Sequence, residues 1–590
     1  MKRMGRFTEF SNKIIGKLNK LTLLQISVII SVVGVVVFFT GLFNGFIGDD
    51  FSQIVSNVPV HSLKNIKLFF DGGTSYNGGG LVPLSGQSFR PLMPVFYSII
   101  YTISGLHTFG YHFAQLLIGI ASSVLLYRVF KYTFKPSLSL LLALIFFIHP
   151  IDSQVLFAMA TLGDALFFFF GILAIWLLLR YKSMRILPLV ALSLLFSMLS
   201  KETAVVCIIM AALYLFWFSR ERLLAFLGIM VFPIALYLAL RIHAIGINPS
   251  SNIAPIDFHS LSGRLMNVPS IISFYIEKFI FPWKLASGYY WVHSSFSFTN
   301  FLLPLFIDIL VIGLAVYIGI LLRKRATKAV FMSYVFFGVW AGIGILPALQ
   351  IIPLDVTVSE TWFYFPMVGV LGMIGIATTA LMPKPRSDIV LAICTGLLVV
   401  LGIRTSLRGL DWKNQYVLAY SDIKGSSQDY NAYNTIARGL ITSGNYSSAK
   451  KYVLKSINIL PSYTNYDSLG VIDMHLGDYF NAETAFDNGL KYGNAVEIHE
   501  NLCTLALVFG TRTMNNSIFI NSLNQFPKDS LMWEYLALYL QMNNDNSGAQ
   551  TAIGKAAMYG QISPTLYQNI INNRAFTLTI SNFGINLNIP

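Results

Sequence analysis

Charged residues and cysteines are both scarce in this sequence. Asp, Glu, Lys and Arg together fill 12% of the 590 positions, whereas soluble domains carry about 25%. The chain has three cysteines, and Cys207, Cys394 and Cys503 lie too far apart for a disulfide framework or a zinc-site spacing. Hydrophobic residues fill 55% of the chain. Much of the protein must therefore be surrounded by something other than water.

The charges that are present sum to +14, but their distribution argues against nucleic-acid binding. The basic residues form short clusters between apolar runs, which is how membrane topology signals are arranged. Leu21 to Phe43 and Ala329 to Ile351 carry no charge and are long enough to cross hydrocarbon. The first of these runs follows a basic stretch but is too long for a signal-peptide core, so we expect a retained first helix.

The composition changes after about Arg404, where Asn, Ser, Tyr, Lys and Asp return at the frequency of soluble proteins. We therefore expect a transmembrane domain at 1–404, a linker at 405–430 and a soluble domain at 431–590. Backbone polar groups in lipid must be bonded internally, so the apolar runs should be helices and the fold class all-α. About eleven spans are predicted, at 21–43, 111–130, 136–149, 163–180, 186–199, 203–219, 223–240, 300–322, 329–351, 364–381 and 388–403.

The basic clusters predict the orientation of these spans. Six Lys and Arg residues before Leu21 place the N-terminus in the cytoplasm. Strict alternation then puts all five later clusters on the same side, beginning at Arg128, Arg180, Arg220, Arg323 and Lys384. The loop at 44–110 and the C-terminal domain fall outside. The apolar stretch Pro91–Gly105 must then be an interfacial or re-entrant helix, because counting it as a span would break the alternation.

The C-terminal domain carries a repeated pattern. Gly444, Tyr446 and Ala449 are followed 33 residues later by Gly477, Tyr479 and Ala482. Small residues at helix crossings and an aromatic residue after the turn are typical of tetratricopeptide repeats. We expect a helical solenoid whose concave surface binds peptide, while a generic helical tail remains the alternative.

Two adjacent acids, Asp49 and Asp50, follow the first span directly. Neighbouring carboxylates at an apolar boundary disfavour joint ionisation, which raises one pKa. A carboxylate with a raised pKa suits abstraction of a hydroxyl proton. The alternative is a pair of solvated loop acids.

Other ionisable residues are predicted on the same outer side. They are Arg90, His112, His149, Asp164, Lys201, Glu202 and Glu360. Cations around a cavity that faces the membrane could clamp the phosphate of an anionic lipid. Each residue taken alone could instead be an ordinary helix-end charge.

The order of these motifs resembles the glycosyltransferase C superfamily, and most closely its transmembrane-and-tetratricopeptide (TPR) protein O-mannosyltransferases. The motifs run from Asp49-Asp50 through Phe89-Arg90-Pro91-Leu92, Tyr111-His112, His149-Pro150, Asp164, Ser200-Lys201-Glu202, Tyr275, Phe281-Pro282, Leu285, Leu346-Pro347, Glu360 and Phe363-Tyr364-Phe365-Pro366 to Asp411-Trp412. The resemblance implies transfer of a hexose, by default mannose, from a polyprenyl-phosphate donor to a hydroxyl acceptor, with inversion at the anomeric carbon.

On that resemblance, Asp49 or Asp50 is the general base. Arg90, His149 and Lys201 are candidates to hold the donor phosphate. His112, Asp164, Glu202 and Glu360 would support them. Two places depart from the family pattern: Thr361 follows Glu360 where an arginine is usual, and Asp152 and Gln154 stand where a glutamate is usual.

The expected partners are the donor, an acceptor protein at the repeat domain and the lipid bilayer, with no cofactor and no metal. The expected location is a bacterial cell membrane, with the C-terminal domain extracytoplasmic. Three alternatives stay open: a transferase that modifies a cell-envelope glycan or lipid, a transporter with a docking domain, and a scaffold without chemistry. A transporter usually shows internal repeats in its membrane half, and none is visible here.

Overall fold

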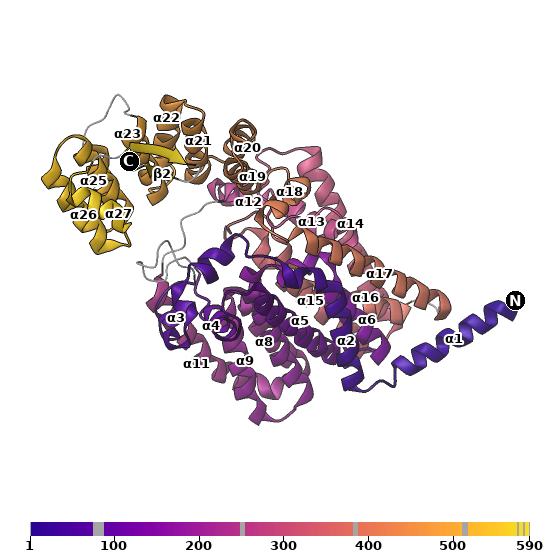
Figure 1. The fold of residues 1–590 in the computed structure, drawn as a ribbon. Coiled ribbons are helices and arrows are strands. Elements are labelled where there is room, and N and C mark those ends of the chain that lie inside the picture. The colour runs from indigo at the N-terminus through magenta and orange to yellow at the C-terminus, as the bar shows by residue number, and fades with distance from the viewer. Residues whose placement is uncertain are drawn as a thin grey trace. The chain divides into compact units, whose positions relative to one another are not determined.

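The computed structural model describes residues 2–74, 88–247, 254–381, 387–509, 517–574, 577–581 and 584–588. The chain forms two compact units, Met1–Ser426 and Ser427–Pro590, and helices dominate both (Figure 1). The expected all-helical fold is confirmed. The boundary between the units lies near the end of the segment predicted as a linker, because residues 405–425 are largely helical and pack with the first unit.

The first unit contains eighteen helices labelled α1 to α18 among the described residues. They are α1 (Lys2–Leu18), α2 (Leu23–Phe38), α3 (Leu68–Asp71), α4 (Leu92–Ser104), α5 (Thr108–Phe130), α6 (Pro136–Ile148), α7 (Gln154–Phe157), α8 (Leu162–Arg180), α9 (Leu187–Ser200), α10 (Val205–Phe218), α11 (Arg220–Ile245), α12 (Leu261–Leu265), α13 (Val268–Ile280), α14 (Leu303–Arg325), α15 (Lys328–Ile345), α16 (Tyr364–Leu381), α17 (Ser387–Asp411) and α18 (Gln415–Gly425). Short 3-10 or π turns join several of them. Those used below are η1 (Phe39–Phe43), η5 (Pro150–Asp152), η6 (Met159–Thr161), η8 (Glu202–Ala204), η11 (Leu346–Leu349) and η12 (Glu360–Phe363).

Eight helices in the described part of the chain are long and apolar enough to cross a membrane. A ninth candidate is the pair Pro136–Ile148 and Pro150–Phe157, bent by 49°. All eleven predicted spans correspond to helices, but Met184–Ser200 and Glu202–Phe218 fall short of the length of a candidate span, and Pro136–Ile148 reaches it only together with Pro150–Phe157. Lys201, which has an extended backbone, separates Met184–Ser200 from Glu202–Phe218. The 13-residue helix α4 lies where an interfacial or re-entrant segment was expected, and it is too short to span hydrocarbon.

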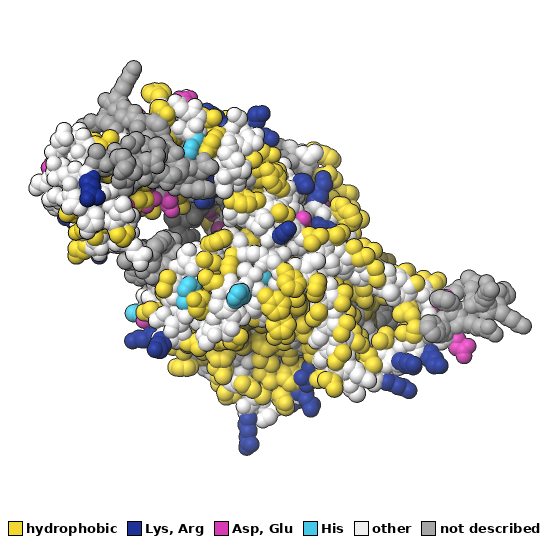
Figure 2. Space-filling view, viewed as in Figure 1, with side chains coloured by type: hydrophobic (Ala, Val, Ile, Leu, Met, Phe, Trp, Pro, Cys, Tyr) yellow, Lys and Arg dark blue, Asp and Glu magenta, His cyan; other side chains and the backbone are white. Residues whose placement is uncertain are grey.

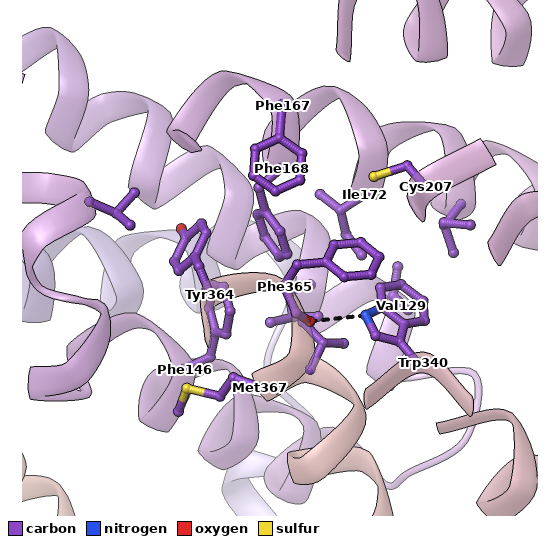
Figure 3. Packing of buried hydrophobic residues seen from close by; sticks show 14 of the residues in the cluster. Val129, Phe146, Phe167, Phe168, Ile172, Cys207, Trp340, Tyr364, Phe365 and Met367 are labelled. Atoms are coloured by element: carbon purple, nitrogen blue, oxygen red, sulfur yellow. Dashed lines mark hydrogen bonds between the residues drawn. The ribbon is translucent and has the colours of Figure 1, made fainter. Parts of the chain in front are cut away.

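The core of the first unit is built around α8, which is apolar on every side. Thirteen of its nineteen residues are buried, as expected of a helix surrounded by other helices. Phe146 of α6 and Phe168 of α8 stack at 4.9 Å, and Tyr364 of α16 packs on both rings. The Trp340 indole donates a hydrogen bond of 3.0 Å to the Phe365 carbonyl beside them (Figure 3). These contacts fix α6, α8, α15 and α16 together.

The outer surface of the first unit is apolar, as Figure 2 shows over a broad yellow area. Large side chains on α2 and α11 are strongly exposed, including Leu24 at 74% and Leu224 at 81%. Helix α14 buries only Asp308 and Leu322. Exposed apolar surface of this extent is not stable in water, because soluble monomers rarely expose patches beyond a few hundred Å². The first unit is an integral membrane domain.

The second unit consists of helix hairpins. Its elements are α19 (Tyr430–Thr442), α20 (Tyr446–Ile459), α21 (Tyr463–His475), α22 (Tyr479–Leu490), α23 (Val496–Phe509), α24 (Ser517–Gln525), α25 (Ser530–Met542), α26 (Asn546–Tyr559), α27 (Pro564–Ile571), β1 (Thr577–Ser581) and β2 (Gly584–Asn588). The strands pair antiparallel, with Thr577 opposite Asn588.

Three of the hairpin turns share one backbone conformation. Gly444, Gly477 and Asn544 each adopt positive φ between the two helices of a pair, a conformation that glycine and asparagine tolerate best. After each turn a small residue, Ala449, Ala482 or Ala549, is completely buried. The repeated pattern of the sequence thus corresponds to repeated helix pairs.

Candidate functional site

Asp50 is buried, and both of its carboxylate oxygens accept hydrogen bonds from backbone N–H groups. Its Oδ2 accepts a 2.8 Å hydrogen bond from the Ile47 N–H, and its Oδ1 accepts a 2.9 Å bond from the Ala160 N–H at η6. The residue is 2% exposed. Burial raises the pKa of Asp50 to about 7, although both backbone donors oppose this. Asp50 therefore ties the loop after the first span to the start of α8.

Asp49 faces the other way. Gly48 before it adopts φ of 51°, a conformation that glycine tolerates best, and the two successive acids have different surroundings, since Asp49 is exposed and Asp50 is buried. The Asp49 side chain reaches the surface, and its carboxylate makes no hydrogen bond to any residue that the structure describes. The surrounding protein excludes much of the nearby water, which is the main reason that the pKa of Asp49 is raised; the charge of Asp355 adds to this and Arg90 opposes it. Asp49 is the member of the pair available to a ligand.

Arg90 is held in place by Glu202. The Arg90 Nε donates to Glu202 Oε2 at 2.9 Å, while the Phe89 N–H donates to Glu202 Oε1 at 3.1 Å. Both side chains are 28% exposed. Within the described ranges, the two terminal nitrogens of the guanidinium have no hydrogen-bond partner. Glu202 thus fixes the direction of Arg90 and leaves its outer donors for another group.

Carboxylates surround Arg90. Burial works against its charge, but Glu202, Asp164 and Asp355 together raise the pKa of Arg90. Arg90 in turn acts on Asp49, so the loops after α2 and before α4 belong to one electrostatic neighbourhood. The site thus joins residues that lie far apart in the sequence.

Lys201 and Asp164 form the second charged pair of the site. Lys201 Nζ lies 2.6 Å from Asp164 Oδ1, and the two side chains are only 9% and 7% exposed. Because Lys201 lies in the non-helical break between α9 and η8, its side chain can turn toward the first turn of α8, where Asp164 lies. The pair is positioned by the interruption that shortens these two helices.

A small groove that is partly open to the surroundings lies beside this pair. Its other lining is mostly apolar and comes from Phe167, Thr203, Val206, Gly344, Pro347, Ala348, Leu354, Thr361, Trp362 and Phe365. An apolar groove with one ion pair suits a ligand that has a hydrocarbon part and a charged part. Thr361, which stands where the family usually has an arginine, lies in this lining.

The two predicted histidines contact backbone instead. His112 Nε2 lies 3.2 Å from the Asn44 carbonyl oxygen. His149 Nε2 lies 3.0 Å from the Phe279 carbonyl oxygen, and its Nδ1 accepts a bond from the Ile151 N–H. Both rings are buried. Among the described side chains, neither histidine is bonded to Arg90 or Lys201, so the contacts do not bring His149 to the predicted phosphate site.

Glu360 belongs to a separate buried network. Its Oε1 accepts from the Tyr289 hydroxyl at 2.7 Å and from the Ala286 N–H at 2.8 Å. Arg408, which is completely buried near the end of α17, lies 3.6 Å from Asp422 of α18 and 3.2 Å from Asp411. Asp422 also receives hydrogen bonds from Ser287. This network fastens α17 and α18 to the loop at 285–289.

Asp152 lies in the same interior region. It is 2% exposed, and neither carboxylate oxygen has a hydrogen-bond partner among the described residues. Contacts between η5 and η12 bring its segment beside that of Glu360. Glu360, predicted with the site residues, is therefore placed with these interior acids rather than in the groove lining.

Asp355 and Arg408 were missed by the sequence reasoning. Asp355 lies in a loop with no recognisable motif. The one sequence feature that could have marked it is that the predicted topology puts this loop on the outer side, with the other candidate residues. Arg408 was missed because the last span was predicted to end at residue 403, whereas α17 continues to Asp411. In the ranges that the structure covers, no group of three or more His, Cys, Asp or Glu residues is arranged to hold a metal ion.

Comparison with known proteins shows which family the sequence resembles. The family described as dolichyl-phosphate-mannose-protein mannosyltransferase matches residues 88–244, a range that contains Arg90, Asp164, Lys201 and Glu202. The chain resembles the protein O-mannosyltransferases. The human protein O-mannosyl-transferase TMTC3 is 21% identical over 478 residues, which cover 73% of this chain and 51% of the relative. Its mouse counterpart is 28% identical over 142 residues, covering 24% of this chain and 15% of the relative.

The resemblance to the glycosyltransferase C superfamily and its TMTC-like mannosyltransferases is thus confirmed. The chain spans about half the length of the human relative that it matches. No solved structure matches the chain.

Proposed function

We propose that this protein is a membrane glycosyltransferase that moves a hexose, by default mannose, from a polyprenyl-phosphate donor to a Ser or Thr hydroxyl of a protein, on the extracytoplasmic side of a bacterial cell membrane. The observation that carries the proposal is an exposed acid without a hydrogen-bond partner among the described residues, Asp49, within the electrostatic influence of Arg90. Glu202 orients Arg90, and the residue beside Glu202, Lys201, lines an apolar groove with Asp164. The similarity to protein O-mannosyltransferases supports the reaction class.

The groove suits the donor. A polyprenyl chain could enter an apolar lining directly from the hydrocarbon, and its phosphate would meet Lys201 and the outer donors of Arg90. Arginine and lysine are the usual ligands of phosphate. The same cations would stabilise the negative charge that develops on the phosphate as it leaves.

Asp49 is the proposed general base. It takes the proton of the acceptor hydroxyl as the acceptor oxygen forms a bond to the anomeric carbon. The bond between that carbon and the phosphate oxygen breaks, and its electron pair leaves with the phosphate. Attack on the face opposite the leaving phosphate inverts the anomeric configuration. Asp50 cannot easily take this role, because backbone N–H groups occupy both of its oxygens.

The placement of charges supports one membrane side for the site. Asp164 lies in the first turn of α8 and Arg180 in its last turn, so a helix length separates the site from that basic cluster. Arg128 likewise lies at the end of α5, and Arg323 to Arg325 lie at the end of α14. Since basic clusters favour the cytoplasm, the site would face the opposite side. The helix hairpins of the second unit, TPR-like in sequence pattern, would bind acceptor protein there.

The test is transfer of mannose from a polyprenyl-phosphate donor to Ser/Thr peptides by the purified full chain in lipid nanodiscs, read by mass spectrometry. Asp49→Asn should lower the rate by about 10² or more, the usual contribution of a general base. Glu277→Gln is the matched control, because this exposed acid pairs with Lys278 instead. Activity should persist in chelator, since the proposal includes no metal. Transfer only to a lipid or glycan would overturn the protein acceptor, and no hexose transfer would overturn the enzyme.

A further inference from the structure

The first helices of the four helix pairs in the second unit lie beside one another. Helix α19 contacts α21, α21 contacts α23, and α23 contacts α25 (Figure 1). In stacked repeats of this kind, a residue at one register position recurs on the same side of each helix. The register is marked by a small residue that is buried in every first helix, namely Ala437, Gly470, Cys503 and Ala537.

An oxygen-bearing side chain recurs at one register position of these helices. Three residues before the buried small residues, the helices carry Asn434, Asp467, Glu500 and Glu534, which we call the acidic row. Counting from the turns gives the same positions, because Asn434, Asp467 and Glu534 each lie ten residues before a turn residue with positive φ. Each repeat therefore contributes one member of the row, at spacings of 33, 33 and 34 residues.

The row lies along the contacts between successive first helices. Asn501 of α23 donates from Nδ2 to Asp467 Oδ1 at 2.7 Å. The Nδ2 of Asn434 donates to the Thr464 carbonyl of α21 at 3.5 Å. These bonds connect members of the row to the next first helix along the unit. The row is therefore one continuous strip across the repeats and not a set of isolated side chains.

The strip has hydrogen-bond acceptors without donors. Asn434 is 6% exposed, and its Oδ1 has no hydrogen-bond partner among the described residues, although buried polar atoms are nearly always bonded. Glu500 and Glu534 are half-buried, and in the described part of the chain neither carboxylate forms a hydrogen bond or an ion pair. The strip thus lacks donors, and positively charged donors match its charge best.

The acids of the row also disfavour one another's ionisation. Burial and the charges of neighbouring acids raise the pKa of Asp467 to about 6 and the pKa values of Glu500 and Glu534 to about 7. Arg438, exposed on α19, opposes this at Asp467. Charges that oppose folding are expected where they serve a function. A bound cation would remove the conflict.

We propose that the acidic row binds an extended protein segment with a basic side chain at about every third residue. Packed helices lie about 8–10 Å apart, and three residues in polyproline II conformation advance about 9 Å and return to the same face. A lysine or arginine at every third position of the segment therefore meets one member of the row in each repeat. The inference rests on the proposed function only for the role of the segment, which would belong to the acceptor protein.

Fluorescence anisotropy of labelled peptides with the full chain in detergent at pH 8 tests the spacing without catalysis. The probe is a peptide of four Lys-Ser-Pro repeats. The comparison peptide has the same composition, but its four lysines are consecutive. The probe should bind more tightly, and added salt should weaken its binding because exposed ion pairs are screened. Equal or weaker binding of the probe would overturn the match between peptide spacing and repeats.

Substitutions in the row test which residues bind the probe. The double variant Glu500→Gln and Glu534→Gln should bind it about five- to tenfold more weakly, the effect of losing two partly exposed ion pairs. The matched control is Glu483→Gln with Asp487→Asn, which removes two acids from the second helix α22. Unchanged affinity in the row variant, or an equal loss in the control, would exclude the row as the binding surface.

Transfer of mannose to the same peptides separates this inference from the proposed function. A chain that binds the probe through the row but transfers no hexose supports the row and overturns the enzyme. A chain that transfers mannose but binds both peptides equally supports the enzyme and overturns the row.

Discussion

Arg90 and Glu202 are 112 residues apart in the sequence, and their side chains meet at 2.9 Å. The contact joins the segment before α4 to η8. A second hydrogen bond, from the Phe89 N–H to the other oxygen of Glu202, attaches the segment at two points. A cation held in this way keeps its direction whether or not a ligand is present. That is the property needed to stabilise charge on a leaving phosphate without reorganisation.

Glu202 should therefore matter to the reaction although it faces Arg90 and not the groove. Glu202→Gln keeps an acceptor for one of the two donors but removes the charge that orients the guanidinium. We expect kcat/KM to fall by about 10- to 100-fold, since small errors in the placement of catalytic groups have effects of this order. Steady-state kinetics with a Ser/Thr peptide would measure it. A variant with wild-type kcat/KM would contradict the positioning role.

Asp50 should affect stability more than chemistry. Asp50→Asn replaces one accepting oxygen by an NH₂ group, so one of the Ile47 and Ala160 N–H donors loses its partner. An unsatisfied buried donor costs about 1–3 kcal/mol. We expect a lower melting temperature in detergent but a smaller loss of transfer rate than in Asp49→Asn. A larger rate loss in Asp50→Asn would reverse the assignment of the two acids.

Arg408 should be essential for the stability of the membrane unit. Arg408→Met leaves Glu360 and Asp422 buried without their cation, and removal of one partner from a buried charge network costs about 3–5 kcal/mol. Thermal unfolding of the purified full chain would detect the change. Arg404→Ala is the control, because Arg404 donates to the Trp283 carbonyl at an exposed position. Equal melting temperatures for the two variants would show that the network is not stabilising.

The second unit should be more stable at acidic pH. Burial, with the charges of Asp529, Glu497 and Asp467, raises the pKa of Glu500 to about 7. Burial and Asp529 raise the pKa of Glu534 to about 7. Because these folded-state pKa values lie above the unfolded value near 4.5, the folded state binds protons more tightly. The stabilisation is complete below about pH 4.5 and is lost as pH rises through about 7.

The double variant Glu500→Gln and Glu534→Gln tests this dependence. It should resist proteolysis of the second unit better than the wild type at pH 8, and equally below about pH 4.5. The difference should amount to roughly 1–2 kcal/mol after allowance for solvent screening. Limited proteolysis of the full chain, with fragments quantified by mass spectrometry, would measure it. A variant that is less stable at pH 8 would contradict the sign.

The sequence by itself determined the membrane helices and the helix pairs of the second unit. Both depend on local patterns: an uncharged apolar run has no alternative to a helix in lipid, and the turn residues Gly444 and Gly477 recur at a fixed spacing. It also determined which ionisable residues were candidates, because charges are so few in this chain.

Only the tertiary structure decided how those candidates are grouped. It buries Asp50 on two backbone donors while Asp49 stays exposed. The packing of α4, α8 and α9 brings Arg90, Asp164, Lys201 and Glu202 into one neighbourhood. The same packing assigns Glu360 to an interior network with Arg408 and directs His149 to a backbone carbonyl. Such contacts depend on which helix faces meet, and a one-dimensional pattern of apolar residues does not specify that.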